Sequence, residues 1–465
     1  MSSVNPKPYD HSQPVEYKSI RLIISDDNQI EIKDLVSDID IFEHLDKPYL
    51  TGVMNILDNR DLFGAIDING ATRINITLKT NLGSSGGNKN KEVTREFFID
   101  HIISSKKYQE KGEMYTVHLL ESFEYLSNMT SINKAYVGTC SRIISKLIQN
   151  IDTDNEIDFF STEKDIQNMK VIIPYLSVTD AMAWIKNRAH TTEGYPFYLY
   201  TTFAGPRTIN FFDLKTLLKA NPINKIPYSF SSTKTHSEKD DKIYSDRQRT
   251  VILDYKSNDT ENLYTLIERG MLTSFVQHID VTSQIKKDPI TFKIEDVLDT
   301  LSNDQIIDLS PSSFDYNINE IKYLTSPQIT GKMITQIGGT FSYDTLESTG
   351  SRGDTRLNSY SESIGTAGYK GQMVSRTMDA LMKKDPLTIT VNGIDFLQGD
   401  ESTTIGNKIR VSFPINDTEF PSTRTTDYKK SGDYLIYSAR HSFRGNAYTV
   451  SLTGMKLNGM DQNDT

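Results

Sequence analysis

The sequence predicts a mainly β protein with an α/β part, in which two similar β-barrel domains flank an α/β domain that interrupts them. Alternating apolar and polar segments occur near both ends of the chain, the two end regions share a repeated pattern, and the middle has helical spacing. The 465 residues amount to about three domains of roughly 100–200 residues. Aromatic content is dominated by 24 Tyr and 20 Phe, residues that favour strands.

Composition excludes several classes of protein. One cysteine, Cys140, rules out an internal disulfide, and eight scattered histidines predict no zinc framework. The 51 basic and 61 acidic residues give a net charge of −10, which argues against a protein that coats nucleic acid. No apolar run approaches the roughly 18–20 residues of a membrane helix, and residues 1–10 contain no apolar core of a secretory signal.

The first β region follows an N-terminal arm, residues 1–17, which contains three prolines. Residues 73–78 alternate cleanly and place Ile74, Ile76 and Leu78 on one face of a strand. A polar loop with five glycines or serines in succession occupies residues 83–91. The strands expected in this region are residues 19–25, 29–32, 52–57, 73–78, 97–103 and 115–120.

The pattern changes to α/β after residue 126. Residues 140–149 have apolar side chains at helical spacing, and Thr139 or Ser141 is expected to cap this helix. A second helix is expected to begin near Thr179, followed by strands at residues 195–202 and 208–213.

The last third mixes irregular sequence with a return to strands. The later elements expected are a helix at residues 374–383 and strands at residues 387–391, 408–413, 433–439 and 448–452. The complete division predicted is an N-terminal arm (1–17), a first β-barrel domain (18–126), an α/β middle domain (127–228), a linker (229–249), the first part of the second barrel region (250–287), an irregular excursion of middle-domain or interface loops (288–372), the second β-barrel domain (373–457) and a C-terminal tail (458–465).

An internal repeat is the strongest signal in the sequence. Residues 112–119 and 445–452 agree in Gly, Tyr, Thr, Val and Leu at the same five places. The glycine followed by a strand at residues 70–78 is matched at residues 406–413, and a polar loop separates strand from hairpin in both copies. This order predicts an internal duplication, although two hairpins can also share turn glycines by chance.

A search for chemistry yields no motif of known mechanism. His118 and His441 lie in or beside hairpin strands, where a lone histidine is more often filler than a general base. Asp58, Asp61 and Asp67 could approach one another closely enough to hold a hard cation, but nothing in the pattern builds an oxygen cage. We therefore predict no catalytic, cofactor-binding or metal-binding residue and no cofactor.

The chain resembles the central baseplate hub of contractile-tailed phages of the T-even kind, which is similar to the N-terminal part of the VgrG spike proteins of type VI secretion. Hydrophobic signatures rather than invariant catalytic residues carry the resemblance. Residues 301–369 and 221–249 have no counterpart in it. The segments that carry it are residues 171–185, 195–200, 434–443 and 448–452.

The resemblance implies a structural virion protein without enzymatic activity. Such a protein would form a homotrimeric ring at the tail baseplate, assembled in the host cytoplasm and without a membrane anchor. Two barrels per chain place six similar units in the ring, which can join a three-fold spike to a six-fold tail tube. The implied partners are a tail spike protein, with or without a lysozyme domain, a tube initiator or tube proteins, and genomic DNA in transit.

Two other functions remain open from the sequence. A cell-wall-degrading, lysozyme-like enzyme would need an acidic pair in a cleft, and Glu156 and Asp158 are the candidates by proximity. A receptor-binding tail component would instead carry aromatic clusters at loop tips.

One further expectation follows from the duplication and another from the resemblance. Tyr115 and Tyr448 occupy equivalent places, so both rings should be at least partly buried. The resemblance implies that DNA passes through the ring without binding, so the lumen should lack a continuous basic belt. The alternative is that the net charge of −10 only reflects solubility. The lysines are mostly spread singly through loops, as at Lys89, Lys91, Lys106, Lys107 and Lys429.

Overall fold

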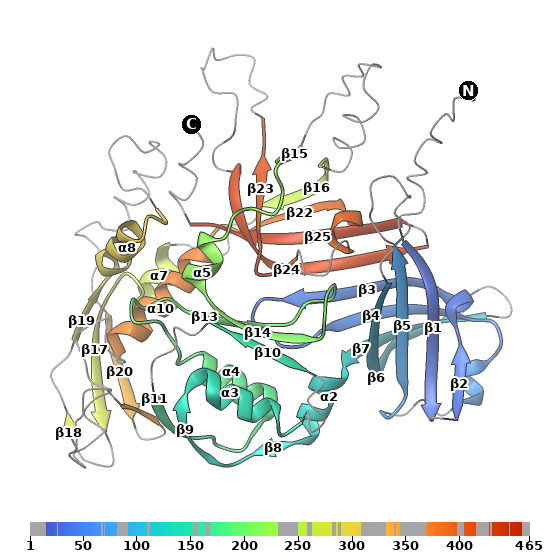
Figure 1. Ribbon diagram of the computed structural model, residues 1–465, viewed down its shortest axis with the longest axis horizontal. Helices are drawn as coiled ribbons and strands as arrows, with labels where there is room; N and C mark the ends of the chain where they lie inside the picture. Colours follow the sequence, from blue (N-terminus) through green and yellow to red (C-terminus); the bar gives the residue numbers. More distant parts are fainter. Residues whose placement is uncertain are drawn as a thin grey trace, which may run out of the picture.

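The computed structural model is mainly β, as the sequence predicts, with one large antiparallel sheet and several small ones (Figure 1). None of the helices in the described part of the chain is long and apolar enough to span a membrane. The structure describes residues 15–25, 27–66, 68, 70–80, 92–108, 112–151, 157–162, 168–230, 250–257, 263–280, 285–286, 290–307, 332–338, 341–344, 369–397, 404–414, 427, 430–445 and 447–457.

The first β unit is a strongly curved sheet with its core on the inner face. The alternation in residues 73–78 is confirmed, because Ile74, Ile76 and Leu78 are all buried. The spatial order of its strands is β3-β4-β7-β6-β5-β1-β2, with the short α1 (Leu62–Ala65) between β4 and β5. The strands are β1 (Val15–Ser25), β2 (Asn28–Glu31), β3 (Val36–His44), β4 (Thr51–Asp58), β5 (Arg73–Thr80), β6 (Glu92–Tyr108) and β7 (Gly112–Glu121).

The second β unit repeats this arrangement. The order β3-β4-β7-β6-β5 of the first unit is matched by β16-β22-β25-β24-β23 in the second, and an outer strand follows in each, β1 in one and β15 in the other. The duplication that the sequence indicates is therefore present in the strand topology. The strands of this unit are β15 (Tyr228–Ser229), β16 (Ile252–Ser257), β22 (Leu387–Asn392), β23 (Lys408–Ser412), β24 (Gly432–Arg444) and β25 (Ala447–Met455).

The two units are joined edge to edge into one sheet of 13 strands. β24 of the second unit pairs antiparallel with β3 of the first, from Ser438 opposite His44 to Arg444 opposite Asp38. Figure 1 shows the red strands of the C-terminal region running directly above the blue β3. The sequence predicts two units separated along the chain, and the structure adds that they are neighbours in space.

The α/β unit has a core of its own below the sheet. The helix expected at residues 140–149 is confirmed as α3, and the Thr139 side chain accepts the backbone N–H of Arg142 as its cap. The second helix begins at Val178, capped by Ser177, close to the predicted start. The elements are α2 (Ser122–Met129), β8 (Ser131–Ile132), β9 (Ala135–Thr139), α3 (Cys140–Ile148), β10 (Asp158–Ser161), β11 (Asn168–Ile172), β12 (Leu176–Ser177), α4 (Val178–Lys186), β13 (Phe197–Tyr200), β14 (Thr208–Asp213) and α5 (Leu214–Lys219).

Residues 250–287 do not all belong to the second barrel region, which corrects that expectation. Only β16 joins the large sheet, whereas β17 pairs with β18, β19 and β20 in a separate four-stranded sheet. The excursion at residues 288–372 also contains regular structure, and β21 pairs with β11 of the α/β unit. The elements are α7 (Leu263–Glu268), β17 (Thr273–Asp280), β18 (Ile285–Lys286), β19 (Ile290–Lys293), α8 (Ile294–Asn303), β20 (Lys332–Gly338), β21 (Phe341–Asp344) and α10 (Tyr369–Met382).

The pairings of β17 with β20 and of β11 with β21 were hidden from the sequence because the two partners are distant along the chain. Residues 231–249 of the predicted linker (229–249), the loop at residues 83–91 and the C-terminal tail lie outside the described residues.

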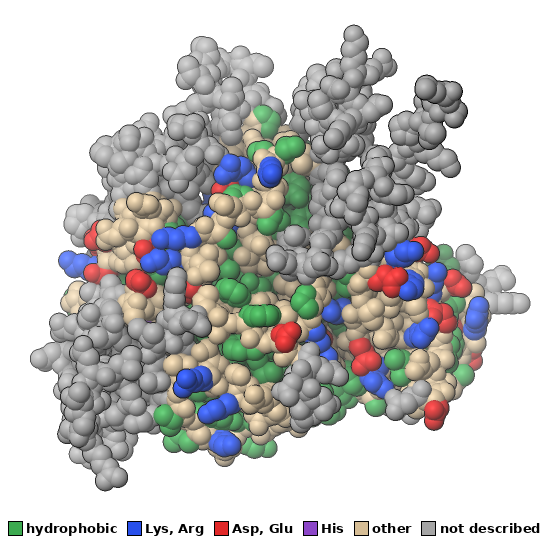
Figure 2. Space-filling model, viewed as in Figure 1, with side chains coloured by type: hydrophobic (Ala, Val, Ile, Leu, Met, Phe, Trp, Pro, Cys, Tyr) green, Lys and Arg blue, Asp and Glu red, His purple; other side chains and the backbone are tan. Residues whose placement is uncertain are grey.

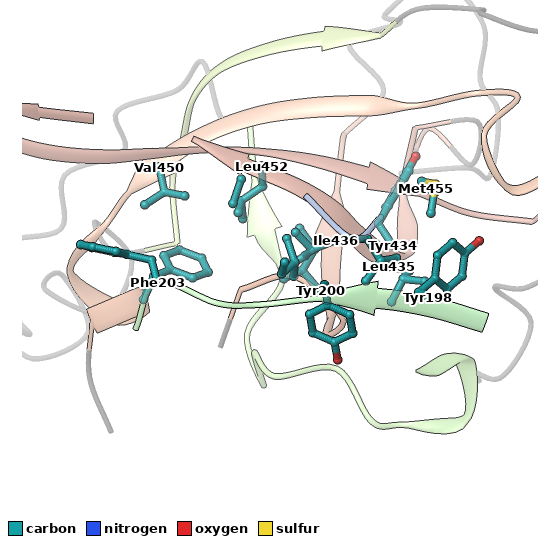
Figure 3. Close-up of a cluster of buried hydrophobic side chains, with 14 of the residues drawn as sticks. Tyr198, Tyr200, Phe203, Tyr434, Leu435, Ile436, Val450, Leu452 and Met455 are labelled. Carbon is teal, nitrogen blue, oxygen red and sulfur yellow. The ribbon is translucent and has the colours of Figure 1, made fainter. Parts of the chain in front are cut away.

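The α/β unit contacts the second β unit through aromatic side chains. Figure 3 shows Tyr198, Tyr200 and Phe203, on and just after β13, lying against residues of β24 and β25. A buried ring of this size contributes heavily to a core. At one end of this contact the backbone of Gly406, with φ of +78°, lies directly against the Tyr200 ring.

We predict that Gly406→Ala lowers the free energy of unfolding by about 2–4 kcal/mol, from backbone strain at positive φ and from collision with Tyr200. Gly445→Ala is the matched control, because Gly445 also has positive φ (+58°) but has no atom within 4 Å of the added methyl. That variant should lose about 1 kcal/mol. Urea denaturation of both variants measures the difference, and equal losses would contradict the Tyr200 contact.

Candidate functional site

The junction between β3 and β24 carries complementary charges on its outer face. Arg440 Nη2 donates to Asp40 Oδ2 at 2.7 Å, and Ser442 Oγ donates to Asp40 Oδ1 at 2.6 Å. Arg444 Nη1 lies 3.0 Å from Asp38 Oδ1. Partial burial raises the pKa of Asp40, but the hydrogen bonds from Arg440 and Ser442 outweigh it and hold the pKa below its usual value.

The inner face of the same junction holds a buried polar cluster. Glu43 accepts the backbone N–H of Phe203 and lies 3.4 Å from His441 Nε2, while His441 Nδ1 lies 2.7 Å from the Tyr448 hydroxyl. Glu43, His441 and Tyr448 are all at most 2% exposed. Burial raises the pKa of Glu43, but its interactions with His441 and the hydrogen bonds it accepts lower the pKa overall. The cluster therefore joins both β units and the segment after β13.

A second polar junction lies at the end of β3. Asp46 Oδ1 accepts from Lys186 Nζ at 2.8 Å, and Asp46 Oδ2 accepts from Lys383 Nζ at 3.1 Å and from the Tyr437 hydroxyl at 2.7 Å. Lys383 Nζ also donates to Asp379 Oδ2 at 2.8 Å. These partners come from α4, from α10 and the residue after it, and from β24. One carboxylate thus connects both β units with the α/β unit.

The electrostatics of this junction favour the ion pairs. Burial raises the pKa of Asp46, but the positive charges of Lys186 and Lys383 hold it far below its usual range. Burial lowers the pKa of Lys383, but Asp379 and Asp46 raise it overall. Both groups therefore stay charged at neutral pH, and removing either partner leaves an unmatched charge in a largely buried place.

Of the three aspartates considered as cation ligands, Asp58 and Asp61 lie in the described part of the chain. Asp58 accepts the backbone N–H groups of Arg60 at 3.0 Å and Phe63 at 2.9 Å, so its carboxylate organises the turn that leads into α1. Asp61 precedes that helix with φ of +53°. Asp67 lies outside the described residues.

His118 has a neighbour that sequence reasoning missed. His101 on β6 is directly opposite His118 on β7, with ring centroids 5.0 Å apart. Asp100 Oδ2 lies 2.7 Å from His101 Nδ1 and 3.1 Å from His118 Nδ1. This is the one group in the described residues with metal-ligand geometry, and it is largely exposed. The cross-strand register that makes these neighbours is not visible in the sequence.

The other residues singled out in the sequence have structural places. Cys140 is buried at the start of α3. Trp184 is covered by the guanidinium of Arg188, which lies 3.6 Å from the ring centroid. Asp158 is exposed at the start of β10, and its candidate partner Glu156 lies outside the described residues. The structure therefore describes only one member of this acidic pair.

The charged residues of the β3–β24 junction were also missed by sequence reasoning. Their signal is the period of two in each strand: Asp38 and Asp40 on β3, and Arg440 and Arg444 at even spacing on β24. Such spacing places like charges on one strand face, where an oppositely charged strand can pair with them. The sequence does not say which strands meet.

Comparisons with known proteins identify the fold. No protein-family model and no curated protein matches the sequence. Among solved structures, a tail protein from Neisseria meningitidis MC58 is similar over 96% of this chain and 97% of its own, with a TM-score of 0.51 and 11% identity. The chain therefore has the fold of that tail protein, and the predicted resemblance is confirmed at the level of fold.

Two further solved structures are similar at lower TM-scores. The 43 kDa tail protein of prophage MuSo2 from Shewanella oneidensis matches over 96% of this chain and all of its own, with a TM-score of 0.47 and 10% identity. A chain of the Francisella PdpA–VgrG complex matches 97% of this chain at a TM-score of 0.44 and 9% identity. This chain spans 54% of that one.

We predict that Asp46→Asn lowers the free energy of unfolding by roughly 2–4 kcal/mol at pH 7, because two lysines lose their counter-charge. The folded pKa of Asp46 is depressed, so its stabilisation is full above the unfolded pKa of about 4 and is lost as pH falls. Urea denaturation between pH 7 and pH 3 should therefore show a shallower acid loss for the variant than for the parent. Exposed Asp158→Asn is the control, and equal effects of the two changes would contradict the junction.

Tyr115 and Tyr448 share a strand position but not an environment. Tyr448 is 2% exposed, whereas Tyr115 is only half-buried and stacks on Phe63, with ring centroids 4.4 Å apart. Both rings are thus at least partly buried, as expected from the repeat.

We predict that Tyr448→Ala lowers the free energy of unfolding by about 3–5 kcal/mol through a core cavity, and that Tyr115→Ala lowers it by about 1 kcal/mol or less. Thermal melts of both variants measure the two losses of stability. A melt of Tyr448→Ala that matches the parent would show that the ring does not fill the core.

Proposed function

We propose that this protein is the structural hub of a phage tail baseplate. In this proposal three chains form a ring of six similar β units, which joins a three-fold spike to a six-fold tail tube. The tail-protein fold supports this placement in the virion. The protein would act by assembly and not by catalysis, since the buried polar clusters join structural units and have ordinary structural partners.

The observation that carries the proposal is the contact between the two units within one chain. β24 of the second unit meets β3 of the first, so two different strands of the repeated unit form the contact. A contact between different surfaces of like units is heterologous, and repeating it gives a ring when the rotation closes. Two units per chain and three chains complete a six-membered ring.

The proposed partners follow from the two symmetries of such a ring. The three-fold symmetry suits a trimeric spike, and the VgrG-containing complex among the similar structures supports a partner of the spike type. The pseudo-six-fold symmetry suits a tube initiator or tube proteins. Genomic DNA would pass through the centre.

The net charge of the protein agrees with the passage of DNA through the ring and not with DNA binding. Each chain has a net charge of −10, which repels a polyanion at low ionic strength. On the face shown in Figure 2, acidic and basic side chains are mixed over the first β unit at the right. Lys106 and Lys107 are exposed on β6, and Lys89, Lys91 and Lys429 lie outside the described residues.

The ring predicts the mass of the particle in solution. At micromolar concentration the protein should form a trimer of about three times the 52.8 kDa chain mass. Light scattering and mass photometry measure this directly. A particle that stays monomeric or dimeric at high concentration would refute the ring.

A further inference from the structure

We infer that the ring closes by strand addition, in which β6 of one chain pairs with β16 of the next chain. This inference rests on the proposed ring. The proposed pairing of β6 with β16 repeats, between chains, the junction that β24 and β3 form within each chain. The internal duplication provides the template, because corresponding strands of the two units should make corresponding contacts.

The hairpins establish which residues of β6 correspond to β24. Tyr115 is opposite Ser105 in the first unit, and the equivalent Tyr448 is opposite Phe443 in the second. Counting from these tyrosines along the β6–β7 and β24–β25 ladders, with their bulges included, matches Ser104 of β6 to Ser442 of β24. It also matches the β6 residues His101, Ile102 and Lys106 to Arg440, His441 and Arg444.

The neighbouring strands establish the match between β16 and β3 in the same way. Val53 of β4 is opposite His118, and its counterpart Thr390 of β22 is opposite Ser451. Asp40 is opposite Val53, and Asp254 is opposite Thr390. Asp254 of β16 therefore corresponds to Asp40 of β3. The next residue pair in each ladder matches Tyr255 of β16 to Ile41 of β3.

Both edges are without a strand partner in the described part of the single chain. β5 pairs with β6 only from Glu92 to Phe98, and the Ile99 N–H donates to the Thr72 carbonyl just before β5. The remaining residues of β6, 100–108, have one neighbouring strand, β7, in the described part of the chain. β16 pairs with β22 alone, apart from a single bridge at Val251 just before it. Asp254 Oδ1 accepts the backbone N–H of Tyr255 at 2.9 Å, so this N–H group is bound by a side chain of its own strand. Long open edges are normally protected or paired.

The open edges also expose apolar side chains. On β6, Ile102 is 41% exposed and Ile103 is 50% exposed. On β16, Leu253 is 56% exposed. His441, the counterpart of Ile102, is completely buried at the junction with β3, where Phe203 also lies near its ring. Pairing of β6 with β16 would bury Ile102 against Tyr255 in the same way.

The polar residues of the two junctions correspond in kind. Within the chain, two arginines and Ser442 on β24 hold Asp40. Between chains, the basic residues His101 and Lys106 and the hydroxyl of Ser104 would approach Asp254. The pattern of base, hydroxyl and base facing an acid is thus present in both places, although the sequences of the strands differ. This complementarity selects β16 of a second copy as the partner of β6.

Each chain contributes one β6 edge and one β16 edge. A closed ring of three chains would contain three such junctions, which alternate with three internal β3–β24 junctions. All six hairpins would then have equivalent neighbours, and neither edge would stay open.

Paired cysteines test this register. In the predicted ladder Ser104 is opposite Asp254, and the Cβ atoms of opposite residues are about 4.5–5.5 Å apart, close enough for a disulfide after small adjustment. We expect Ser104→Cys/Asp254→Cys to give disulfide-linked dimers and trimers on non-reducing gels after mild oxidation, and monomers after reduction. Ser104→Cys/Ser257→Cys is the matched control, since position 257 is out of register and on the other strand face. The natural Cys140 is buried and should not interfere.

A charge exchange gives a test that does not depend on oxidation. Asp254→Lys should weaken trimer formation at least about tenfold, and adding Lys106→Asp should restore part of the loss. Light scattering over a concentration series measures both, and circular dichroism verifies that the variants are folded.

The outcomes separate this inference from the proposed function. Trimers that form without the Ser104–Asp254 crosslink, and that tolerate Asp254→Lys, would overturn the β6–β16 junction and leave the ring intact. A parent protein that stays monomeric at high concentration would overturn both. Trimers with the in-register crosslink, and without the control crosslink, would support both.

Discussion

The antiparallel pairing of β3 with β24 is the interaction on which the rest of the structure depends. It brings together strands about 400 residues apart in the chain, as the contact of Ser442 with Asp40 shows. On its outer face the pairing is held by ion pairs and on its inner face by the buried Glu43, His441 and Tyr448. Without it, the two β units would each have an open edge, and the segment after β13 would lose the carboxylate that binds Phe203.

The Asp46 junction adds the α/β unit to this frame. Its carboxylate is shared by a lysine from α4, a lysine after α10 and a tyrosine from β24, so three separate parts of the chain meet at one anion. Apolar contacts alone would allow these units to slide, because dispersion and hydrophobic burial have little directionality. Directional, charge-assisted hydrogen bonds fix their relative positions. This rigidity suits a protein whose proposed function is to hold partners of different symmetry in register.

The duplication explains why one chain can connect two symmetries. Two units with the same strand order but different side chains can occupy equivalent places in a ring and still offer different outer surfaces. The half-buried Tyr115 and the completely buried Tyr448 illustrate this divergence at one equivalent position. The same divergence separates His101, exposed beside Asp100, from Arg440, which already binds Asp40 within the chain. In the proposed ring, the β6–β16 junction between chains forms on assembly, and the β3–β24 junction within each chain forms on folding.

The sequence by itself determined the local structure: the alternation that buries Ile74, Ile76 and Leu78, the helix that Thr139 caps, and the repeated hairpins with their glycines. These features depend on side-chain period and backbone preference, which act over a few residues. Only the tertiary structure decided that β24 pairs with β3, that β17 leaves the large sheet, and that His101 faces His118. Strand pairing is selected by the burial and charge of whole faces that meet only in the folded chain. A local pattern therefore specifies a strand and its inward face, but not its neighbour.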